Sequence, residues 1–338
     1  MSSLLPRRRS VRTAVIALAA AAMATALTAC GDSDSGASSE ASGTSATSAF
    51  PATVATKFGD VKIDAKPARV VALGWSDAET ALALGVQPVG ASDWLGFGGE
   101  GVGPWAQGQY TKAPELIGTM EPEFEKIAAL KPDLILDVRS SGDQKRYDTL
   151  SKIAPTVGVP EGGDNYLTTW EQQTTMISEA LGVPDEGKKL ISDTDAEFTK
   201  YADENPDFKG RTITVGSKTS EGYGAYLTGD ARVDFVEKLG FENNPTVQKQ
   251  AGDSFFISVS GENLKQLDAD AVLMMPIFID AKEITDDALF KAVPAVKAGH
   301  DVVIDDTNIS NAFSAGTPAA TTYALEKVVP LLKTALGS

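Results

Sequence analysis

A stretch of fourteen residues that occurs twice constrains the fold of this chain more than any other feature. The first copy, EKIAALKPDLILDV, covers residues 125–138, and the second, ENLKQLDADAVLMM, covers residues 262–275. They align without a gap, and both begin with glutamate and carry aspartate at the ninth position. In each copy a helical pattern leads through a polar turn into an apolar run, which is typical of a helix that feeds a buried parallel strand. We therefore predict an α/β fold with two similar lobes.

Two further observations favour a duplicated lobe over the general resemblance of all helix–strand units. The glutamate leads its helix in both copies, and a strand-like segment precedes each copy, at residues 69–73 and 211–216. Between the lobes, residues 166–204 have a helical pattern that is interrupted at Gly182-Val183-Pro184. We expect a long, rigid helix here, which would limit the movement of one lobe against the other.

The N-terminal residues predict export and membrane anchoring. Residues 7–12 contain four arginines and residues 13–29 carry no charge, which is the order of a secretory signal. The only cysteine, Cys30, follows Leu27-Thr28-Ala29, and this sequence resembles the bacterial lipobox. The cysteine of a lipobox is acylated at its thiol and becomes the mature N-terminal residue. Residues 31–49 are small and polar apart from three acids, as in a flexible tether.

We expect five segments along the chain. They are a signal peptide at residues 1–29, the lipidated cysteine and a flexible linker at 30–56, an N-terminal lobe at 57–165, a helical connector at 166–205 and a C-terminal lobe at 206–338. Without the signal peptide the chain has 26 basic and 46 acidic residues, which gives a formal charge of −20. This negative charge argues against a nucleic-acid partner.

Catalytic constellations are hard to find in this sequence. The single histidine, His300, removes the usual general base of a Ser or Cys triad and rules out a metal site of several histidines. The sequence contains no GxxxxGK[ST] phosphate loop and no GxGxxG at a strand–helix junction. We predict a protein that is not an enzyme, and a tethered extracellular hydrolase is the alternative from another class.

Aromatic and cationic side chains follow several of the predicted strands. A glycine-rich loop after the strand near Val89 carries aromatic residues, Arg139 follows the strand of the first repeat, and a loop carrying Lys218 follows residues 211–216. Because ligands in open α/β sheets bind beyond the carboxyl ends of the strands, Arg139 is a candidate to meet an anion. An ordinary surface salt bridge is the alternative role for this residue.

The chain resembles the iron-siderophore class of substrate-binding lipoproteins of ABC importers, the class III type that also serves cobalamin. The resemblance is carried by the lipobox, the tether, the paired lobes and the phrases KPARVVALGWSDAETALALGVQPVG and EKIAALKPDLIL, and it extends from about residue 58 to the C-terminus. It implies two Rossmann-like lobes joined by a single long helix, with a ligand cleft between the lobes. It also implies delivery of the ligand to a membrane permease without any chemical step.

The resemblance implies a role for the two repeats. In this class an exposed glutamate of each lobe docks into arginine pockets of the permease, and Glu125 and Glu262 occupy matching positions. Both residues also stand where the helix macrodipole favours an acid, and the two roles are compatible.

The implied ligand is a ferric siderophore, with iron bound only through the siderophore and no cofactor or direct metal ligand. Cobalamin and haem are alternative cargoes, and the chemical class of the siderophore stays open. The resemblance also implies a monomer on the extracytoplasmic face of the cell membrane. The residues we expect to line the cleft are Trp75, Trp94, Trp105, Tyr110, Arg139, Lys218, Tyr223, Tyr226 and Phe313.

Overall fold

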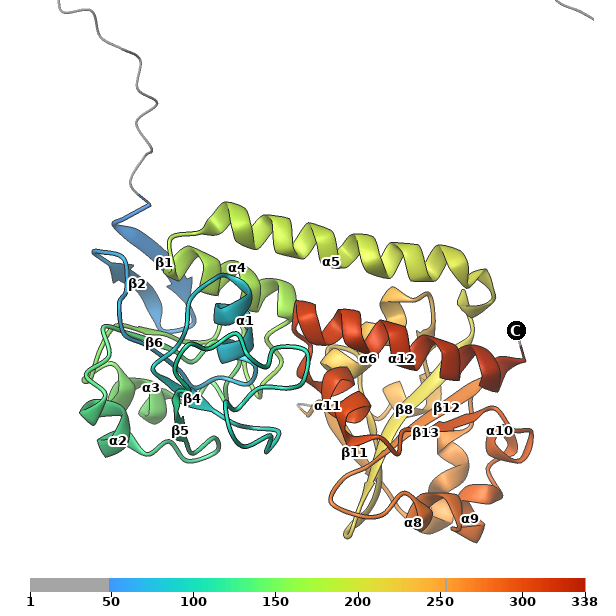
Figure 1. Ribbon diagram of the computed structural model, residues 1–338. Helices are drawn as coiled ribbons and strands as arrows, with labels where there is room; N and C mark the ends of the chain where they lie inside the picture. Colours follow the sequence, from blue (N-terminus) through green and yellow to red (C-terminus); the bar gives the residue numbers. More distant parts are fainter. Residues whose placement is uncertain (1–48, 253, 338) are drawn as a thin grey trace, which may run out of the picture. The chain divides into compact units, whose positions relative to one another are not determined.

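The computed structural model describes residues 49–252 and 254–337. The predicted signal peptide and the lipidation of Cys30 lie outside these residues. The described chain begins with a small antiparallel sheet of β1 (Ala52–Thr56) and β2 (Gly59–Ile63), shown in Figure 1. The predicted linker extends to residue 56, whereas residues 52–56 already form a paired strand. Alternating apolar side chains explain the difference, because Val54 is buried in the core of the N-terminal lobe.

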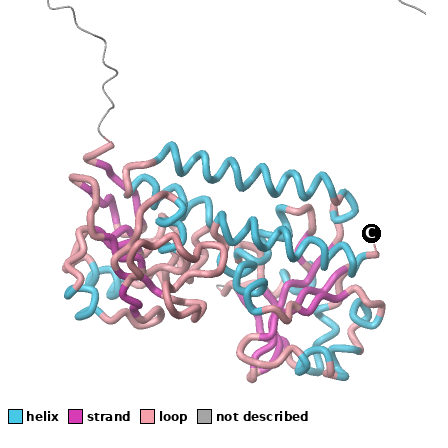
Figure 2. The backbone as a smooth tube through the Cα atoms, viewed as in Figure 1, coloured by secondary structure: helices cyan, strands magenta, loops and turns pink. Residues whose placement is uncertain are grey.

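The N-terminal lobe contains a parallel sheet of five strands in the order β5-β4-β3-β6-β7. Its strands are β3 (Val70–Ala72), β4 (Gly90–Ser92), β5 (Glu115–Ile117), β6 (Leu134–Leu136) and β7 (Thr156–Val157). Its helices are α1 (Asp77–Ala83), α2 (Phe124–Ala129), α3 (Gln144–Leu150) and α4 (Trp170–Ala180). Residues 93–114 between β4 and β5 form neither helix nor strand, as Figure 2 shows by the long loops of this lobe.

The C-terminal lobe contains a mixed sheet in the order β11-β9-β8-β12-β13, with β10 paired to the start of β8. Its strands are β8 (Thr212–Thr219), β9 (Gly222–Tyr226), β10 (Glu242–Asn243), β11 (Phe256–Val259), β12 (Ala271–Pro276) and β13 (Asp301–Val303). Its helices are η1 (Pro206–Phe208), α6 (Ala231–Lys238), α7 (Pro245–Gln248), η2 (Gly261–Leu267), α8 (Lys282–Thr285), α9 (Ala288–Lys291), α10 (Pro294–Lys297), α11 (Thr307–Ala315) and α12 (Pro318–Leu336).

The sheets of the two lobes have matching strand orders, although β9 runs antiparallel to β8 where β4 runs parallel to β3. The predicted pair of similar α/β lobes is confirmed. In each lobe the strand of the repeat pairs in parallel with the first strand of the lobe's main sheet, β6 with β3 and β12 with β8. The aligned aspartates make equivalent contacts. Asp133 accepts hydrogen bonds from the backbone N–H groups of Ala68 and Arg69, and Asp270 accepts one from the N–H of Thr212. Each aspartate therefore ties the repeat to the start of the neighbouring strand.

The C-terminal lobe departs from the sequence prediction in one segment. The residues after 216 were predicted to be a loop, but they continue β8 and turn back as β9. Gly222 and Gly224 hide this strand because glycine interrupts the apolar alternation. Gly224 is required by packing, since a Cβ atom there would lie 1.9 Å from Cζ of Phe256 on β11.

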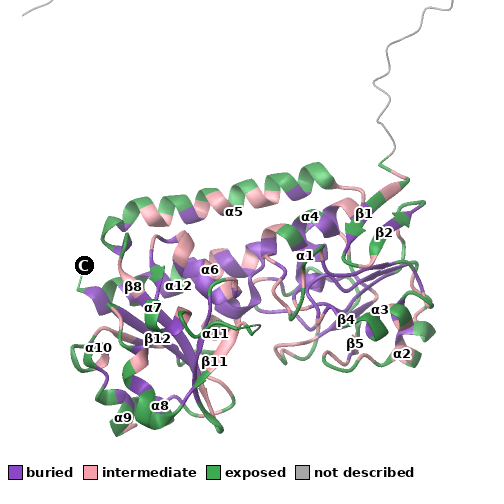
Figure 3. Ribbon diagram, turned by 180° about the vertical axis from the view of Figure 1, so that it is seen from behind, coloured by how far each residue is buried: buried purple, intermediate pink, exposed green. Residues whose placement is uncertain are grey.

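The long helix α5 (Pro184–Glu204) connects the two lobes, as predicted. Its 21 residues span about 31 Å at the rise of an α-helix. Leu190 near its start packs on the core of the N-terminal lobe, whereas Phe198 and Tyr201 pack on the core of the C-terminal lobe. Most of the helix is exposed (Figure 3), and it lies beside α12. The connecting helix is thus held by both lobes.

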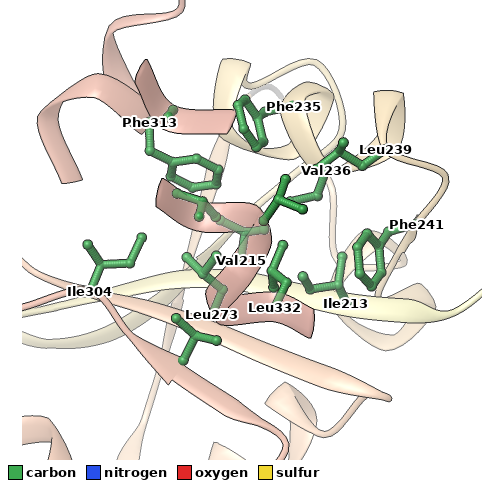
Figure 4. Packing of buried hydrophobic residues seen from close by; sticks show 14 of the residues in the cluster. Ile213, Val215, Phe235, Val236, Leu239, Phe241, Leu273, Ile304, Phe313 and Leu332 are labelled. Carbon is green, nitrogen blue, oxygen red and sulfur yellow. The ribbon is translucent and has the colours of Figure 1, made fainter. Parts of the chain in front are cut away.

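The strands alternate their side chains between two cores in each lobe. Leu273 and Met275 face the core that α6, α11 and α12 cover, whereas Val272 and Met274 face the opposite core. Figure 4 shows the first of these cores, in which Leu273 lies among side chains of β8, α6 and α12. In the part of the chain that the structure describes, no helix combines the length and the apolar character needed to cross a bilayer.

Candidate functional site

A cavity of about 820 Å³ lies where strand ends of the two lobes meet. The N-terminal lobe contributes residues that follow β3 and β4, and the C-terminal lobe contributes residues that follow β12 and β13 together with one face of α11. Its lining consists of Trp75, Trp94, Leu95, Arg232, Met275, Pro276, Ile277, Phe278, Ile279, Asp280, Ala281, Glu283, Ile304, Asp305, Thr307, Ser310, Asn311 and Ser314. This is the position at which open α/β sheets collect ligands.

A stack of three aromatic rings forms the wall of the N-terminal lobe. The ring of Trp75 lies between that of Trp94, with centroids 4.3 Å apart, and that of Tyr166, with centroids 4.1 Å apart. Parallel rings at these distances stabilise one another by about 1 kcal/mol per pair. The indole Nε1 of Trp75 is buried and has no hydrogen-bond partner in the described structure. The stack therefore presents a flat, rigid aromatic surface.

Ser76 fixes this wall and contacts the opposite lobe. Its hydroxyl accepts a hydrogen bond from Nε1 of Trp94 at 3.2 Å and donates one to the carbonyl oxygen of Ala315 at 2.8 Å. The backbone of Ser76 adopts the left-handed conformation, with φ at 64°. A residue other than glycine rarely adopts this conformation, and such strain persists where surrounding contacts enforce it. Ser76 therefore couples the position of Trp94 to the last turn of α11.

Arg139 lies behind the aromatic wall and does not line the cavity. Its side chain is 3% exposed, and its guanidinium donates hydrogen bonds to the carbonyl oxygens of Ala315 at 2.9 Å and Tyr166 at 3.2 Å. The guanidinium carbon lies 5.9 Å from the ring of Trp75 and 5.8 Å from that of Trp94. Burial lowers the pKa of Arg139 to about 10, although nearby Asp230 acts in the opposite direction. Arg139 thus supports the wall and bridges the lobes.

Two other predicted residues of the N-terminal lobe lie away from the cavity. Trp105 donates a hydrogen bond from Nε1 to the buried carboxylate of Glu79 at 2.9 Å. Tyr110 is 7% exposed, and its hydroxyl is buried without a partner in the described structure, so burial raises its pKa. Both rings pack in a small apolar cluster with Leu82 and Val102.

The four predicted residues of the C-terminal lobe are also engaged inside the lobe. Lys218 forms an ion pair with Asp287 at 3.1 Å, and the hydroxyl of Tyr223 donates to the same carboxylate at 2.9 Å. Tyr226 is 3% exposed. Phe313 is 1% exposed and points into the core shown in Figure 4, where its ring lies 5.1 Å from that of Phe235. Of the nine residues predicted for the cleft, Trp75 and Trp94 line this cavity.

Sequence reasoning missed an arginine and a phenylalanine of the opposite wall. Arg232 lies 3.7 Å above the ring of Tyr226, and its Nε and Nη2 atoms each donate to the carboxylate of Asp230 at 2.7 Å. Burial lowers the pKa of Arg232, but Asp230 and Tyr226 together outweigh this effect and raise the pKa above the ordinary value. Phe278 is fully exposed and has a φ of 56°. Its position directly after β12 was the signal that could have identified it.

The described part of the chain offers no direct site for a metal ion. Residues 49–252 and 254–337 contain no group of three or more His, Cys, Asp or Glu side chains placed to hold one.

Comparisons with known proteins agree with this architecture. Residues 70–307 match a family described as periplasmic binding protein. A probable siderophore-binding lipoprotein of Bacillus subtilis, YfiY, is 30% identical over 282 residues, which are 79% of this chain and 82% of the relative.

Two solved structures are similar over most of the chain. Streptococcus pneumoniae PiaA in complex with ferrichrome has a TM-score of 0.72 at 28% identity and matches over 84% of this chain and 98% of its own. Staphylococcus aureus SirA complexed with staphyloferrin B has a TM-score of 0.66 at 26% identity, with 84% of this chain and 98% of that chain covered.

Proposed function

The chain belongs to the periplasmic binding protein family, and from this premise we propose that it captures a ferric siderophore outside the cell and delivers it to the permease of an ABC importer. The family and the relatives above are substrate-binding proteins. In this proposal the protein performs no chemistry on its ligand, acts as a monomer and binds iron only through the siderophore.

The cavity between the lobes is the observation that carries this proposal. Its volume of about 820 Å³ suits a ligand larger than an amino acid or a simple sugar. Trp75 and Trp94 supply flat apolar surface on one side, and Phe278 supplies an exposed ring on the other. A ferric complex that brings its own metal ligands needs such surfaces and polar contacts rather than protein donors to iron.

Binding of a ferric chelate is tested by titrating the purified protein and following its tryptophan fluorescence. The panel contains ferric hydroxamates, ferric catecholates, ferric citrate, haemin and cyanocobalamin. We expect saturable quenching at sub-micromolar concentration by at least one ferric chelate, because Trp75 and Trp94 line the cavity. Saturation by haemin or cyanocobalamin alone would assign another cargo to the same importer role. If no ligand of the panel changed the fluorescence and the protein hydrolysed esters or peptides, it would be the tethered hydrolase instead.

Delivery to a permease is proposed to use Glu125 and Glu262. Both side chains are exposed, and each lies in the first turn of the helix that precedes the repeat strand, α2 for Glu125 and η2 for Glu262. In cells that depend on this protein for iron, replacing both glutamates by alanine should abolish uptake and leave siderophore affinity unchanged. Replacing Glu186, an exposed acid in the first turn of α5, is the matched control and should leave uptake intact. Normal uptake by the double variant would remove the docking role.

Attachment to the extracytoplasmic face of the cell membrane is proposed to use Cys30. Metabolic labelling with a radioactive fatty acid should label the protein, and Cys30→Ser should abolish both the label and retention in the membrane fraction. Unchanged labelling of the variant would refute lipidation at this cysteine.

A further inference from the structure

We propose that the ligand of this cavity is a ferric complex with a net charge of zero or above, such as a tris-hydroxamate complex, rather than a polyanionic carboxylate or catecholate complex. This inference rests on the proposed function and narrows its ligand class. The relatives bind chelators of different kinds, ferrichrome and staphyloferrin B among them, so similarity alone leaves the charge of the ligand open. We infer the charge of the ligand from the charges on the walls of the cavity.

The cation of the cavity lining and two cations behind its walls already have protein partners. Arg232 is the cation among the lining residues, and the carboxylate of Asp230 accepts hydrogen bonds from two of its nitrogens. Arg139 is buried behind the tryptophans and donates to backbone carbonyl oxygens. Lys218 is paired with Asp287. Arg232 and Lys218 can therefore offer an anionic ligand little uncompensated positive charge, and Arg139 does not line the cavity.

Three carboxylates on the C-terminal lobe line the same cavity. Asp280 and Glu283 follow β12, and Asp305 follows β13. All three are exposed, and none of them takes part in an ion pair with a described residue. The charge of Arg232 is cancelled by that of its partner Asp230, so the three carboxylates leave the lining with a formal charge of −3. A ligand in the cavity therefore meets a negative field from one side.

The size of this field follows from the size of the cavity. A sphere of 820 Å³ has a radius of about 6 Å, which sets the distance from a carboxylate to the ligand centre. At this distance, with screening at physiological ionic strength, one exposed carboxylate changes affinity about twofold for each unit of ligand charge. Three such groups change it about eightfold per unit charge. A trianionic complex would thus lose several hundredfold relative to a neutral one.

The remaining lining suits a neutral or cationic complex. Thr307, Ser310, Asn311 and Ser314 present hydroxyl and amide groups, which can hydrogen-bond the oxygen atoms of a chelate without carrying charge. Trp94 lines the cavity and stacks on Trp75 with one face, so its other face can attract a cation. An ammonium group would also be favoured by the carboxylates. Shape and neutral hydrogen bonds would hold the complex, and charge would select against anions.

A matched pair of ligands tests the charge of the complex directly. Ferrioxamine B carries a terminal ammonium group, and acetylation of this amine removes one positive charge without altering the iron chelate. In fluorescence titrations of the purified protein we expect the free amine form to bind about eightfold more tightly than the acetylated form. Ferric citrate and a ferric tris-catecholate should bind at least about a hundredfold more weakly than either.

A charge-neutral variant assigns the effect to this cavity. Asp280→Asn, Glu283→Gln and Asp305→Asn together should reduce the eightfold preference to about twofold or less. The matched control removes the same number of charges from exposed positions on α5, with Asp185→Asn, Glu186→Gln and Glu204→Gln, and should keep the preference.

The possible outcomes separate the two proposals. Tighter binding of ferric citrate or the catecholate than of both hydroxamates would overturn the charge inference and keep siderophore capture. Equal binding of the matched pair, or an unchanged preference in the cavity variant, would also overturn it. Failure of every ferric complex to bind would overturn siderophore capture and this inference together.

Discussion

A hydrogen bond between Glu79 and Thr317 should couple the stability of the two lobes. The Glu79 carboxylate on α1 accepts hydrogen bonds from Nε1 of Trp105 at 2.9 Å, from the N–H of Gly103 at 3.1 Å and from the hydroxyl of Thr317 at 2.9 Å. Glu79 is 7% exposed and Thr317 is 1% exposed, and burial raises the pKa of Glu79. The same Thr317 hydroxyl caps the N-terminus of α12 by accepting from the N–H of Ala320.

The magnitude follows from the partners that each substitution removes. A hydrogen bond to a charged group contributes about 2 kcal/mol, and each buried donor left without a partner costs 1 kcal/mol or more. We expect Glu79→Ala to lower the free energy of unfolding by about 4 kcal/mol. Thr317→Val should lower it by about 3 kcal/mol, of which about 1 is the lost cap. The double variant should lose about 5 kcal/mol rather than 7, because both single changes remove the same bond.

Urea unfolding of wild type, the two single variants and the double variant measures this coupling energy, provided that the four proteins have the same dependence of unfolding free energy on urea concentration. Thr334→Val is the matched control, because Thr334 is an exposed threonine of α12 far along the helix from Glu79, and its effect should add to that of Glu79→Ala. A coupling energy below about 0.5 kcal/mol for Glu79 and Thr317 would refute the argument that this bond joins the lobes.

Three further predictions concern single side chains. Burial raises the pKa of Asp234 to about 6, so the folded state binds more protons than the unfolded state between about pH 4 and pH 6 and stability falls as the pH rises. The free energy of unfolding of Asp234→Asn relative to wild type should therefore rise by about 2 kcal/mol from pH 4 to pH 7, and a flat difference in urea titrations would contradict this. Tyr110→Phe removes a buried hydroxyl without a partner in the described structure, so thermal stability should stay equal or increase and siderophore affinity should not change; a several-fold loss of affinity would return Tyr110 to the site. Phe278→Ala should change stability by less than about 0.5 kcal/mol because the ring is exposed, and it should weaken siderophore binding about fivefold; unchanged binding would remove Phe278 from the site.

The architecture could be predicted well because helices and buried strands each leave a periodic pattern of apolar residues in the sequence. The repeat placed a helix before a buried strand in each lobe, and the structure has α2 before β6 and η2 before β12. The pattern could not distinguish the α-helix of the first copy from the 3₁₀-helix of the second, since both bury apolar residues at similar spacing. The strand β9 was missed because two of its five residues are glycine.

The site was harder to predict because the end of a strand determines where the backbone lies but not which way a side chain points. The rule that ligands bind beyond the carboxyl ends of strands selected Trp75 and Trp94, which line the cavity. The same rule selected Tyr226 and Phe313, whose rings turn into the core of the C-terminal lobe. Whether an aromatic residue faces the core or the cleft depends on long-range packing, which leaves no local signal.

The positions of the charged side chains also depend on long-range contacts. Arg139 was expected to meet an anion, but it lies buried against carbonyl oxygens that come from residues 27 and 176 positions further along the chain. Arg232 lies at the cavity with its partner Asp230 only two residues away. A short spacing of opposite charges is common on protein surfaces, so it does not predict a cavity residue by itself.

The central claim is that a ferric siderophore binds against the tryptophan wall between the lobes. It is tested most directly by measuring retention of iron-55-labelled ferrioxamine B by wild type, Trp94→Ala and Trp170→Phe in equilibrium dialysis. Trp170 is a buried tryptophan of α4 and serves as the control for loss of an indole outside the cavity. We predict that Trp94→Ala weakens binding at least about tenfold, because an aromatic contact of this size is worth more than 1 kcal/mol, whereas Trp170→Phe leaves binding unchanged. Equal affinities in all three proteins would contradict the assignment of this cavity as the siderophore site.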